Sequence, residues 1–153
     1  ELGARGSAVG DLDGDGAPDV VLARIDGPAA LGINDLGQDS KRLQVLLRGP
    51  AAPGEGPRRT SRSAHGALLI AVPDFPPSVP EAQQFALLGE VQTGGSFQSA
   101  SSPWVHFGLG RFERLAYLEV RWPSGRSERI EGLRAGRRVV IEEGRGLVSE
   151  EEF

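Results

Sequence analysis

The sequence has no cysteine and no methionine among its 153 residues. Because cysteine is absent, the chain has no disulfide framework, no thiol nucleophile and no thiolate metal site. Because methionine is absent, residue 1 is not an initiator, and we expect a processed chain or an excised piece. The sequence also lacks any run of about eighteen apolar residues, so it predicts no transmembrane segment.

Acidic residues outnumber basic residues by 21 to 17, and the formal net charge is −4 at pH 7. This balance argues against electrostatic capture of nucleic acid. The chain is rich instead in glycine (22) and proline (11), which favours short strands joined by turns over long helices. Its length suits one domain, or one domain with a fragment of another.

The most informative stretch runs from position 11 to position 19 and reads DLDGDGAPD. Its four carboxylates repel one another unless a cation joins them, and the glycines between them let the backbone curl around one centre. Hard oxygen ligands in this number suit Ca²⁺, which takes roughly six to eight oxygens in flexible geometry. We therefore predict a calcium site formed by the side chains of Asp11, Asp13, Asp15 and Asp19 and the carbonyl of Ala17.

Short strands are predicted on both sides of this loop, at residues 7–10 and 20–23. An EF-hand would have helices there and a glutamate at its twelfth position, where this chain has Leu22. The strand–loop–strand unit resembles the FG-GAP or VCBS repeat, which builds blades of integrin-type β-propellers. A propeller needs several blades, so the resemblance implies a propeller-blade remnant here.

Two other interpretations of the acidic stretch remain open. Aspartate and glycine also favour tight bends, so the stretch can be an acidic turn without a metal. The stretch also resembles the nucleophile motif of haloacid-dehalogenase-type phosphatases, in which Asp11 would attack phosphorus and Asp13 would handle protons. That family has threonine or valine where this chain has Asp15, and it needs a later lysine, whereas the only lysine is Lys41.

Alternating apolar residues, glycine and proline divide the rest of the chain into strands and loops. Residues 66–72 are apolar on both faces, which predicts a buried central strand. The other predicted strands are 42–48, 85–93, 104–107, 118–122, 127–130 and finally 137–142. The predicted loops are the 25–41 linker, with a helical turn near 29–31, the mobile 49–65 loop, the proline-rich 73–83 insertion and a frayed acidic tail at 150–152.

Two motifs in the second half of the chain are specific. Residues 106–110 read HFGLG, and residues 120–125 read VRWPSG. With the GGSFQS stretch at 94–99, they resemble the ASPIC and UnbV domain, over roughly residues 42–145. That domain follows FG-GAP/VCBS repeats in the cartilage acidic protein group and in many bacterial secreted proteins. The resemblance implies secretion and a binding or matrix role, and it implies no catalytic residues.

The remaining chemically active side chains form no visible catalytic constellation. His65 lies in the predicted 49–65 loop, and His106 alternates with apolar residues, so we expect His106 to be a structural hydrogen-bonding residue and not a catalytic base. Trp104 and Trp122 are predicted to pack in the core or at its rim, with a sugar-stacking platform as the alternative. The arginines of the 49–65 loop are expected to be solvated.

Together these patterns predict an all-β chain with a calcium-loop β-hairpin attached to an antiparallel β-sandwich or barrel. We expect a hairpin and linker at residues 1–41 and an ASPIC/UnbV-like β domain at residues 42–153. The predicted function is a secreted or periplasmic, calcium-stabilised, non-enzymatic adhesion or structural module that binds an extracellular protein or glycan. The alternatives are a self-assembling extracellular fibre subunit, formed by exchange of strand edges, and the Asp-nucleophile hydrolase.

Overall fold

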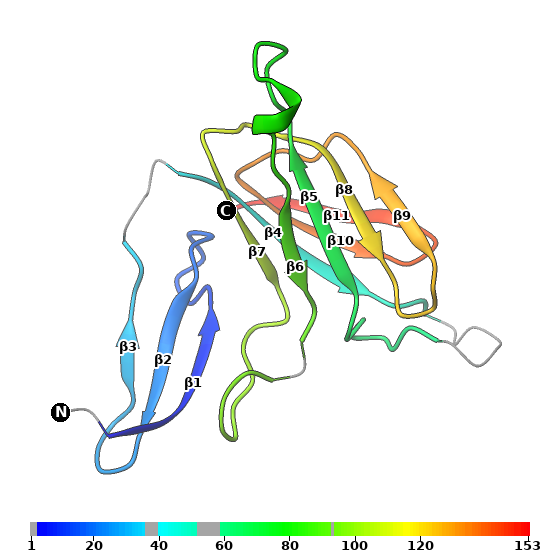
Figure 1. Cartoon of the computed structure of the whole chain (residues 1–153). Helices are drawn as coiled ribbons and strands as arrows, with labels where there is room; N and C mark the ends of the chain where they lie inside the picture. The colour runs from blue at the N-terminus through cyan, green and yellow to red at the C-terminus, as the bar shows by residue number, and fades with distance from the viewer. Residues whose placement is uncertain (1–2, 36–39, 52–58, 93) are drawn as a thin grey trace.

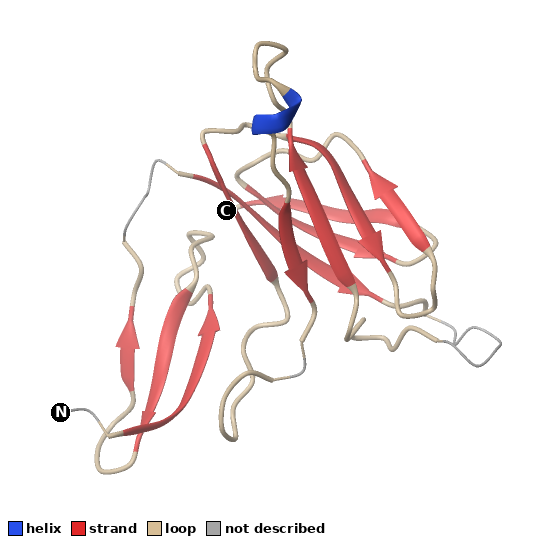
Figure 2. Cartoon of the chain, in the orientation of Figure 1, coloured by secondary structure: helices blue, strands red, loops and turns tan. Residues whose placement is uncertain are grey.

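The computed structural model describes residues 3–35, 40–51, 59–92 and 94–153. Strands dominate this part of the chain, and its one helical element is the short 3-10 helix η1 (Glu81–Gln83) (Figure 2). The strands form three separate sheets with no closed barrel, which confirms the all-β prediction. Within the described ranges, no helix has the length and apolar character needed to cross a membrane.

The first sheet, called sheet A, is built from the N-terminal residues. It contains β1 (Ala4–Gly10), β2 (Asp19–Arg24) and β3 (Ala30–Gly32) in the order β1-β2-β3, all antiparallel. The helical turn predicted near 29–31 is therefore wrong. Leu31 instead pairs with Val21, because β3 supplies hydrogen-bond partners to the outer backbone groups of β2.

The other two sheets pack face to face as a β-sandwich. Sheet B has the order β11-β10-β4-β7 and sheet C the order β6-β5-β8-β9. The pairing is antiparallel except between β10 and β4, which run parallel. The bounds are β4 (Lys41–Arg48), β7 (Val105–Gly110), β10 (Arg137–Glu142), β11 (Gly146–Glu152), β5 (Leu68–Pro73), β6 (Leu87–Glu90), β8 (Leu115–Arg121) and β9 (Ser127–Ile130).

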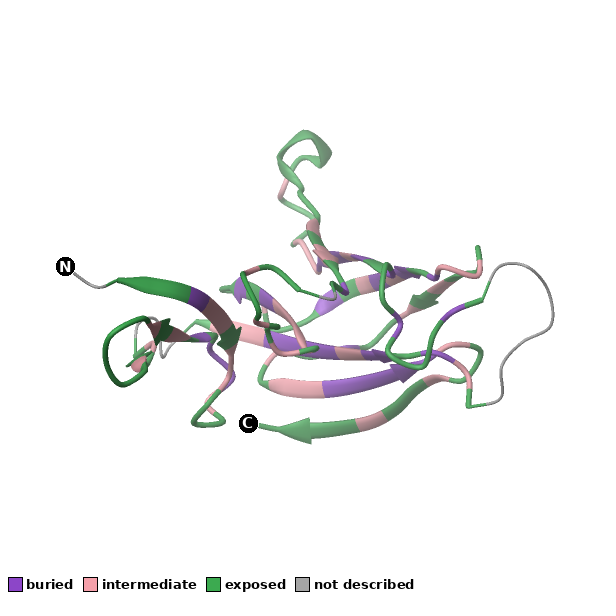
Figure 3. Ribbon diagram, turned by 90° about the horizontal axis from the view of Figure 1, so that it is seen from below, coloured by how far each residue is buried: buried purple, intermediate pink, exposed green. Residues whose placement is uncertain are grey.

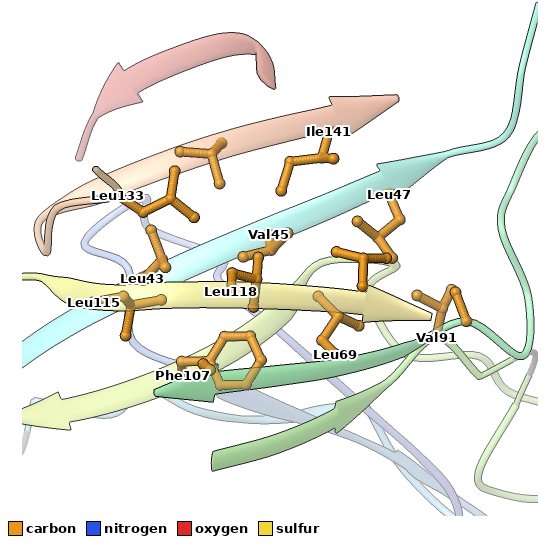
Figure 4. Packing of buried hydrophobic residues seen from close by; sticks show 14 of the residues in the cluster. Leu43, Val45, Leu47, Leu69, Val91, Phe107, Leu115, Leu118, Leu133 and Ile141 are labelled. Carbon is orange, nitrogen blue, oxygen red and sulfur yellow. The ribbon is translucent and has the colours of Figure 1, made fainter. Parts of the chain in front are cut away.

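Alternation along the strands places one face of each sheet in a shared core. On β4 the inward residues are Leu43, Val45 and Leu47, all fully buried. They face Leu69 of β5 and Leu118 of β8 across the sandwich (Figure 4). In Figure 3 the buried residues gather on the strands of the sandwich, whereas sheet A is mostly exposed or intermediate. The sandwich therefore holds the apolar core of the described chain.

The C-terminal strand β11 differs from the prediction, in which 137–142 is the last strand and residues 150–152 are a frayed tail. The tail is instead ordered in β11 and pairs antiparallel with β10. Ion pairs with Arg137 allow a strand that ends in three successive glutamates to join the sheet. Its guanidinium lies 3.7 Å from Glu150 and 2.7 Å from Glu152, so opposite charges face each other across the two strands.

Several other predicted boundaries are wrong. The strand expected at 85–93 is limited to β6, because the Phe85 ring turns aside to pack edge-on against Phe75 and Phe112; Thr93 lies outside the described residues. The strand predicted at 104–107 continues to Gly110. The central strand predicted as apolar on both sides buries one face only, because Leu68 is exposed.

The predicted 49–65 loop is not wholly mobile. Residues 52–58 lie outside the described part, but the segment after them is anchored. Gly49 donates its N–H to the carbonyl of Arg62 (3.1 Å), and Ala64 is fully buried in the core. Arg62 is exposed, as expected of a solvated arginine, and it also pairs with Glu142.

Sheet A lies beside β7 of the sandwich (Figure 1). The outer edge of β1 is covered by the 96–102 segment, since Ser102 donates its N–H to the carbonyl of Val9 (2.8 Å). Ser7 donates its N–H to the Ser96 hydroxyl (3.0 Å) and accepts from the Ser99 hydroxyl (2.9 Å). These bonds satisfy a strand edge that would otherwise be open, and they hold the acidic loop against the sandwich.

Candidate metal centre

The loop from Asp11 to Asp19, here called the Asp loop, connects β1 to β2. Gly14 and Gly16 both adopt a φ of +85°, which side chains other than glycine rarely adopt. The Asp11 carboxylate accepts backbone N–H bonds from both glycines, at 2.7 and 3.0 Å. The loop therefore curls around its own carboxylates, as the glycine spacing predicts.

Three of the predicted ligands converge. The side chains of Asp11, Asp13 and Asp15 each offer an oxygen, and these oxygens all lie within 4.8 Å of one another. Carboxylate oxygens are the donors that Ca²⁺ and Mg²⁺ prefer, and the larger Ca²⁺ tolerates irregular geometry. The chemistry of this donor set fits a hard divalent cation.

The other two predicted ligands, Asp19 and Ala17, lie apart from this group of three. Asp19 is 1% exposed, and its oxygens accept the backbone N–H groups of Leu12 (2.7 Å) and Asn34 (2.8 Å). Ala17 is buried and donates its N–H to the Asp15 carboxylate at 2.7 Å. Both residues clearly shape the loop, while their roles as metal ligands stay predictions.

Side chains of the sandwich complete the surroundings of Asp11. Its Oδ2 atom accepts hydrogen bonds from Gln44 Nε2 (2.7 Å) on β4 and Arg138 Nη2 (2.9 Å) on β10. Gln44 Oε1 in turn accepts from Arg138 Nε (3.1 Å). The Asp11 side chain is only 5% exposed, so this pairing compensates a charge that has lost most of its water.

A second arginine reaches the loop from the start of β4. Arg42 Nη1 lies 3.3 Å from both the carbonyl and the carboxylate of Asp15. Arg42 and Arg138 therefore offset part of the repulsion among the three carboxylates. The sequence pattern does not predict that Gln44, Arg42 and Arg138 belong to this site. The one available indication was Gln44, a polar residue on a strand that is otherwise largely apolar.

The C-terminal residue also belongs to this site. The Arg138 guanidinium lies between two rings, 5.4 Å from the Trp104 centroid and 5.8 Å from the Phe153 centroid. The Phe153 ring packs directly on the backbone of Gly16, where an added Cβ would come within 2.7 Å of it. Phe153 therefore connects the end of the chain to the Asp loop.

His106 lies under the Asp loop on β7. Both ring nitrogens are buried without a hydrogen-bond partner among the described residues. Burial lowers the pKa of His106, and this effect exceeds the opposing influence of the Gly16 backbone and of Asp11. A neutral imidazole therefore packs beside the loop, and the predicted hydrogen-bonding role of His106 finds no partner among the described residues.

Comparison with known proteins identifies part of the chain. Residues 79–148 match the protein-family model described as ASPIC and UnbV, from η1 through the start of β11. The match begins later than the predicted 42–145 range and leaves out the Asp loop and β4. No curated protein matches the chain. The predicted ASPIC/UnbV domain is thus supported, and the FG-GAP/VCBS resemblance of the Asp loop stays a prediction.

Proposed function

We propose that the chain is a secreted, calcium-stabilised, non-enzymatic binding or structural module. In this proposal, Asp11, Asp13 and Asp15 hold a cation that keeps sheet A in place on the sandwich. The observation that carries it is the double role of Asp11. Its carboxylate belongs to the cluster of three, and it also accepts hydrogen bonds from Gln44 and Arg138 of the sandwich.

A cation at this position would stabilise both the loop and its docking. Without it, three carboxylates share a small volume with only two arginines beside them. A ligand that binds only the folded state stabilises by RT ln(1 + [L]/Kd), about 2.7 kcal/mol at a hundredfold excess over Kd. Calcium sites of low affinity are typical of extracellular modules, so a site of this kind would suit a secreted chain.

The test is the melting temperature with calcium and with chelator. We expect calcium to raise it in the native chain and to have no such effect in Asp13→Ala, whose side chain is exposed. Asp26→Ala is the control, because Asp26 is an exposed carboxylate outside the loop. An undiminished calcium shift in Asp13→Ala would overturn the metal assignment.

A second candidate function is self-assembly through sheet A. Much of the exposed apolar surface lies on or beside this small sheet, at Val9, Leu12, Val20, Ile25, Leu31 and Ile33. The strand pairing places Val9 and Val20 on one face of the sheet and Leu31 on the other. Exposed apolar side chains of this kind can mark an interaction surface. Light scattering with calcium and with chelator tests this candidate, and a monomer under both conditions would exclude it.

The hydrolase alternative receives no support from the contacts of Asp11. Its two oxygens accept hydrogen bonds from four donors, namely the backbone of Gly14 and Gly16 and the side chains of Gln44 and Arg138. A carboxylate stabilised in this way is a weak nucleophile. Hydrolysis of p-nitrophenyl phosphate that disappears in Asp11→Asn would revive this alternative.

A further inference from the structure

The outer face of sheet B carries a groove beyond the Asp loop, with a volume of about 560 Å³. We call it the arginine groove, and its defining residues are Arg48, Arg62, Trp104, Arg138, Val140 and Arg145. Its arginines outnumber its carboxylates four to two, the latter being Glu142 and Glu151. The groove is thus locally basic on a chain whose net charge is −4.

Strand register explains how the groove is arranged. Arg138, Val140 and Glu142 alternate along β10, so all three side chains face outward. In the strand register, Glu142 lies beside Arg48 of β4, at the end of the sheet opposite the Asp loop. Arg138 and Glu142 are four positions apart on β10, a separation of about 13 Å. The arginines around Glu142 form a basic end of the groove, and Val140 lies between this end and Arg138.

The basic end is organised around a buried carboxylate. Glu142 is only 5% exposed and accepts hydrogen bonds from Arg62 Nη1 (2.9 Å) and Arg145 Nη1 (3.2 Å). The hydrogen bond from Arg62 lowers the pKa of Glu142, which keeps this anchor charged at neutral pH. Each guanidinium has five N–H donors, so both arginines retain donors for a ligand.

Arg48 adds a cation without a partner. Its side chain is exposed and makes no hydrogen bond or ion pair with another described residue. Arg48, Arg62 and Arg145 together surround a single carboxylate, which leaves positive charge available at this end. Guanidinium groups bind carboxylate and sulfate-like oxyanions with paired hydrogen bonds, so an anionic group fits here.

Trp104 provides the apolar wall of the same groove. It is half-buried, and Arg138 stacks near its ring. The other tryptophan, Trp122, is in the core and donates its indole N–H to Glu128 (3.1 Å). Trp104 is therefore the tryptophan whose ring can meet a flat ligand, with Val140 beside it.

We propose that the arginine groove binds an anionic saccharide. Its carboxylate or sulfate groups would meet Arg48, Arg62 and Arg145, and a sugar ring would lie on Trp104 and Val140. This ligand class rests on the non-enzymatic binding role proposed above. An acidic peptide fits less well, because the groove lies on the face of sheet B, where β4 and β10 already use their backbone groups within the sheet. Peptides that add to a sheet need a free edge.

The experiment is a calorimetric titration of the full chain with matched probes. Dextran sulfate oligomers are compared with neutral dextran oligomers, and oligogalacturonate with its methyl ester. These pairs distinguish sulfate from carboxylate as the anionic group. Poly-L-glutamate tests the peptide alternative. Each titration is repeated with calcium and with chelator, because oligogalacturonate also binds calcium. We expect at least one charged saccharide to bind, its neutral counterpart to fail, and poly-L-glutamate to bind more weakly.

The variants separate the groove from general charge attraction. Arg48→Ala/Arg145→Ala should weaken saccharide binding at least tenfold, and Trp104→Ala should weaken it severalfold. Arg114→Ala/Arg121→Ala removes the same charge from exposed arginines outside the groove and should leave binding unchanged. Equal losses in both double variants, or tighter binding of poly-L-glutamate, would overturn the proposal.

The calcium proposal and the saccharide proposal can be disproved independently of each other. The Arg48→Ala/Arg145→Ala variant should keep the calcium-dependent melting shift, because neither side chain touches the Asp loop. Asp13→Ala in calcium should keep saccharide binding while losing that shift. Absence of binding by every charged saccharide overturns the groove and leaves the calcium-stabilised module standing.

Discussion

At the scale of single residues, the Asp loop is shaped by two glycines with the same backbone but different neighbours. Gly14 and Gly16 both have a φ of +85°. Nothing lies within 4 Å of the Cβ position at Gly14, whereas the Phe153 ring fills that position at Gly16. Substitutions at these two glycines can therefore distinguish the cost of backbone strain from the cost of displacing Phe153.

We predict that Gly14→Ala costs about 1 kcal/mol of unfolding free energy, because alanine is strained at this φ. Gly16→Ala should cost clearly more, since its methyl group must also displace Phe153. Urea unfolding measures both. In a Phe153→Ala background the difference between the two variants should shrink, and an unchanged difference would contradict the contact.

Glu142 makes the stability depend on pH. Arg62 lowers its pKa below the ordinary 4.5, so the folded state binds fewer protons than the unfolded state. The resulting stabilisation is present above pH 4.5 and is lost as the pH falls through the lowered pKa.

Glu142→Gln should therefore be less stable than the native chain at neutral pH, and the difference should decrease as the pH falls below 4.5. Urea unfolding across this range provides the measurement. Glu81→Gln, which alters an exposed glutamate in η1, should show no such trend. A difference independent of pH would mean that the charge of Glu142 is unimportant.

At the scale of elements, the sandwich depends on inward-facing residues of β4, β5, β8 and β10. Leu118 of β8 is fully buried, whereas Leu88 of β6 is 78% exposed. Leucine side chains therefore occupy two different environments within sheet C, one buried and one exposed.

Leu118→Ala should lower the unfolding free energy by about 2–5 kcal/mol, because it removes buried contacts and leaves a cavity. Leu88→Ala should change it by less than about 0.5 kcal/mol. Urea denaturation of both variants tests the assignment. Similar losses of unfolding free energy in the two variants would mean that the Leu88 side chain is covered in solution.

At the scale of the whole molecule, two groups of hydrogen bonds among the described residues join sheet A to the rest of the chain. One is the polar contact of the Asp loop with Gln44, Arg42 and Arg138, and the other is the bonding of β1 to the 96–102 segment. A cation in the Asp loop would act on the first place directly.

Hydrogen exchange with calcium and with chelator should show this difference. We expect chelation to speed amide exchange in the Asp loop and in β1 and β2, while the buried strands β4 and β8 keep their protection. The physical reason is that local opening needs only the loss of the docking contacts. A uniform change across the chain would instead indicate that calcium controls global stability.

The sequence by itself determined the all-β class, the acidic loop and the ASPIC/UnbV motifs. These follow from local information: alternation along strands, carboxylates spaced by glycine, and short specific stretches such as 106–110. Local patterns also mislead, since they predict a helical turn where β3 lies and a frayed tail at 150–152, where β11 ends.

Only the tertiary structure decided which distant residues meet. Asp11 bonds to Arg138, 127 positions later, and Arg62 to Glu142, 80 positions later. Strand order and register set these meetings, and the parallel pairing of β10 with β4 places Gln44 beside Arg138 and Arg48 beside Glu142. Alternation tells which side of a strand a residue takes, but it does not tell which strand lies beside it.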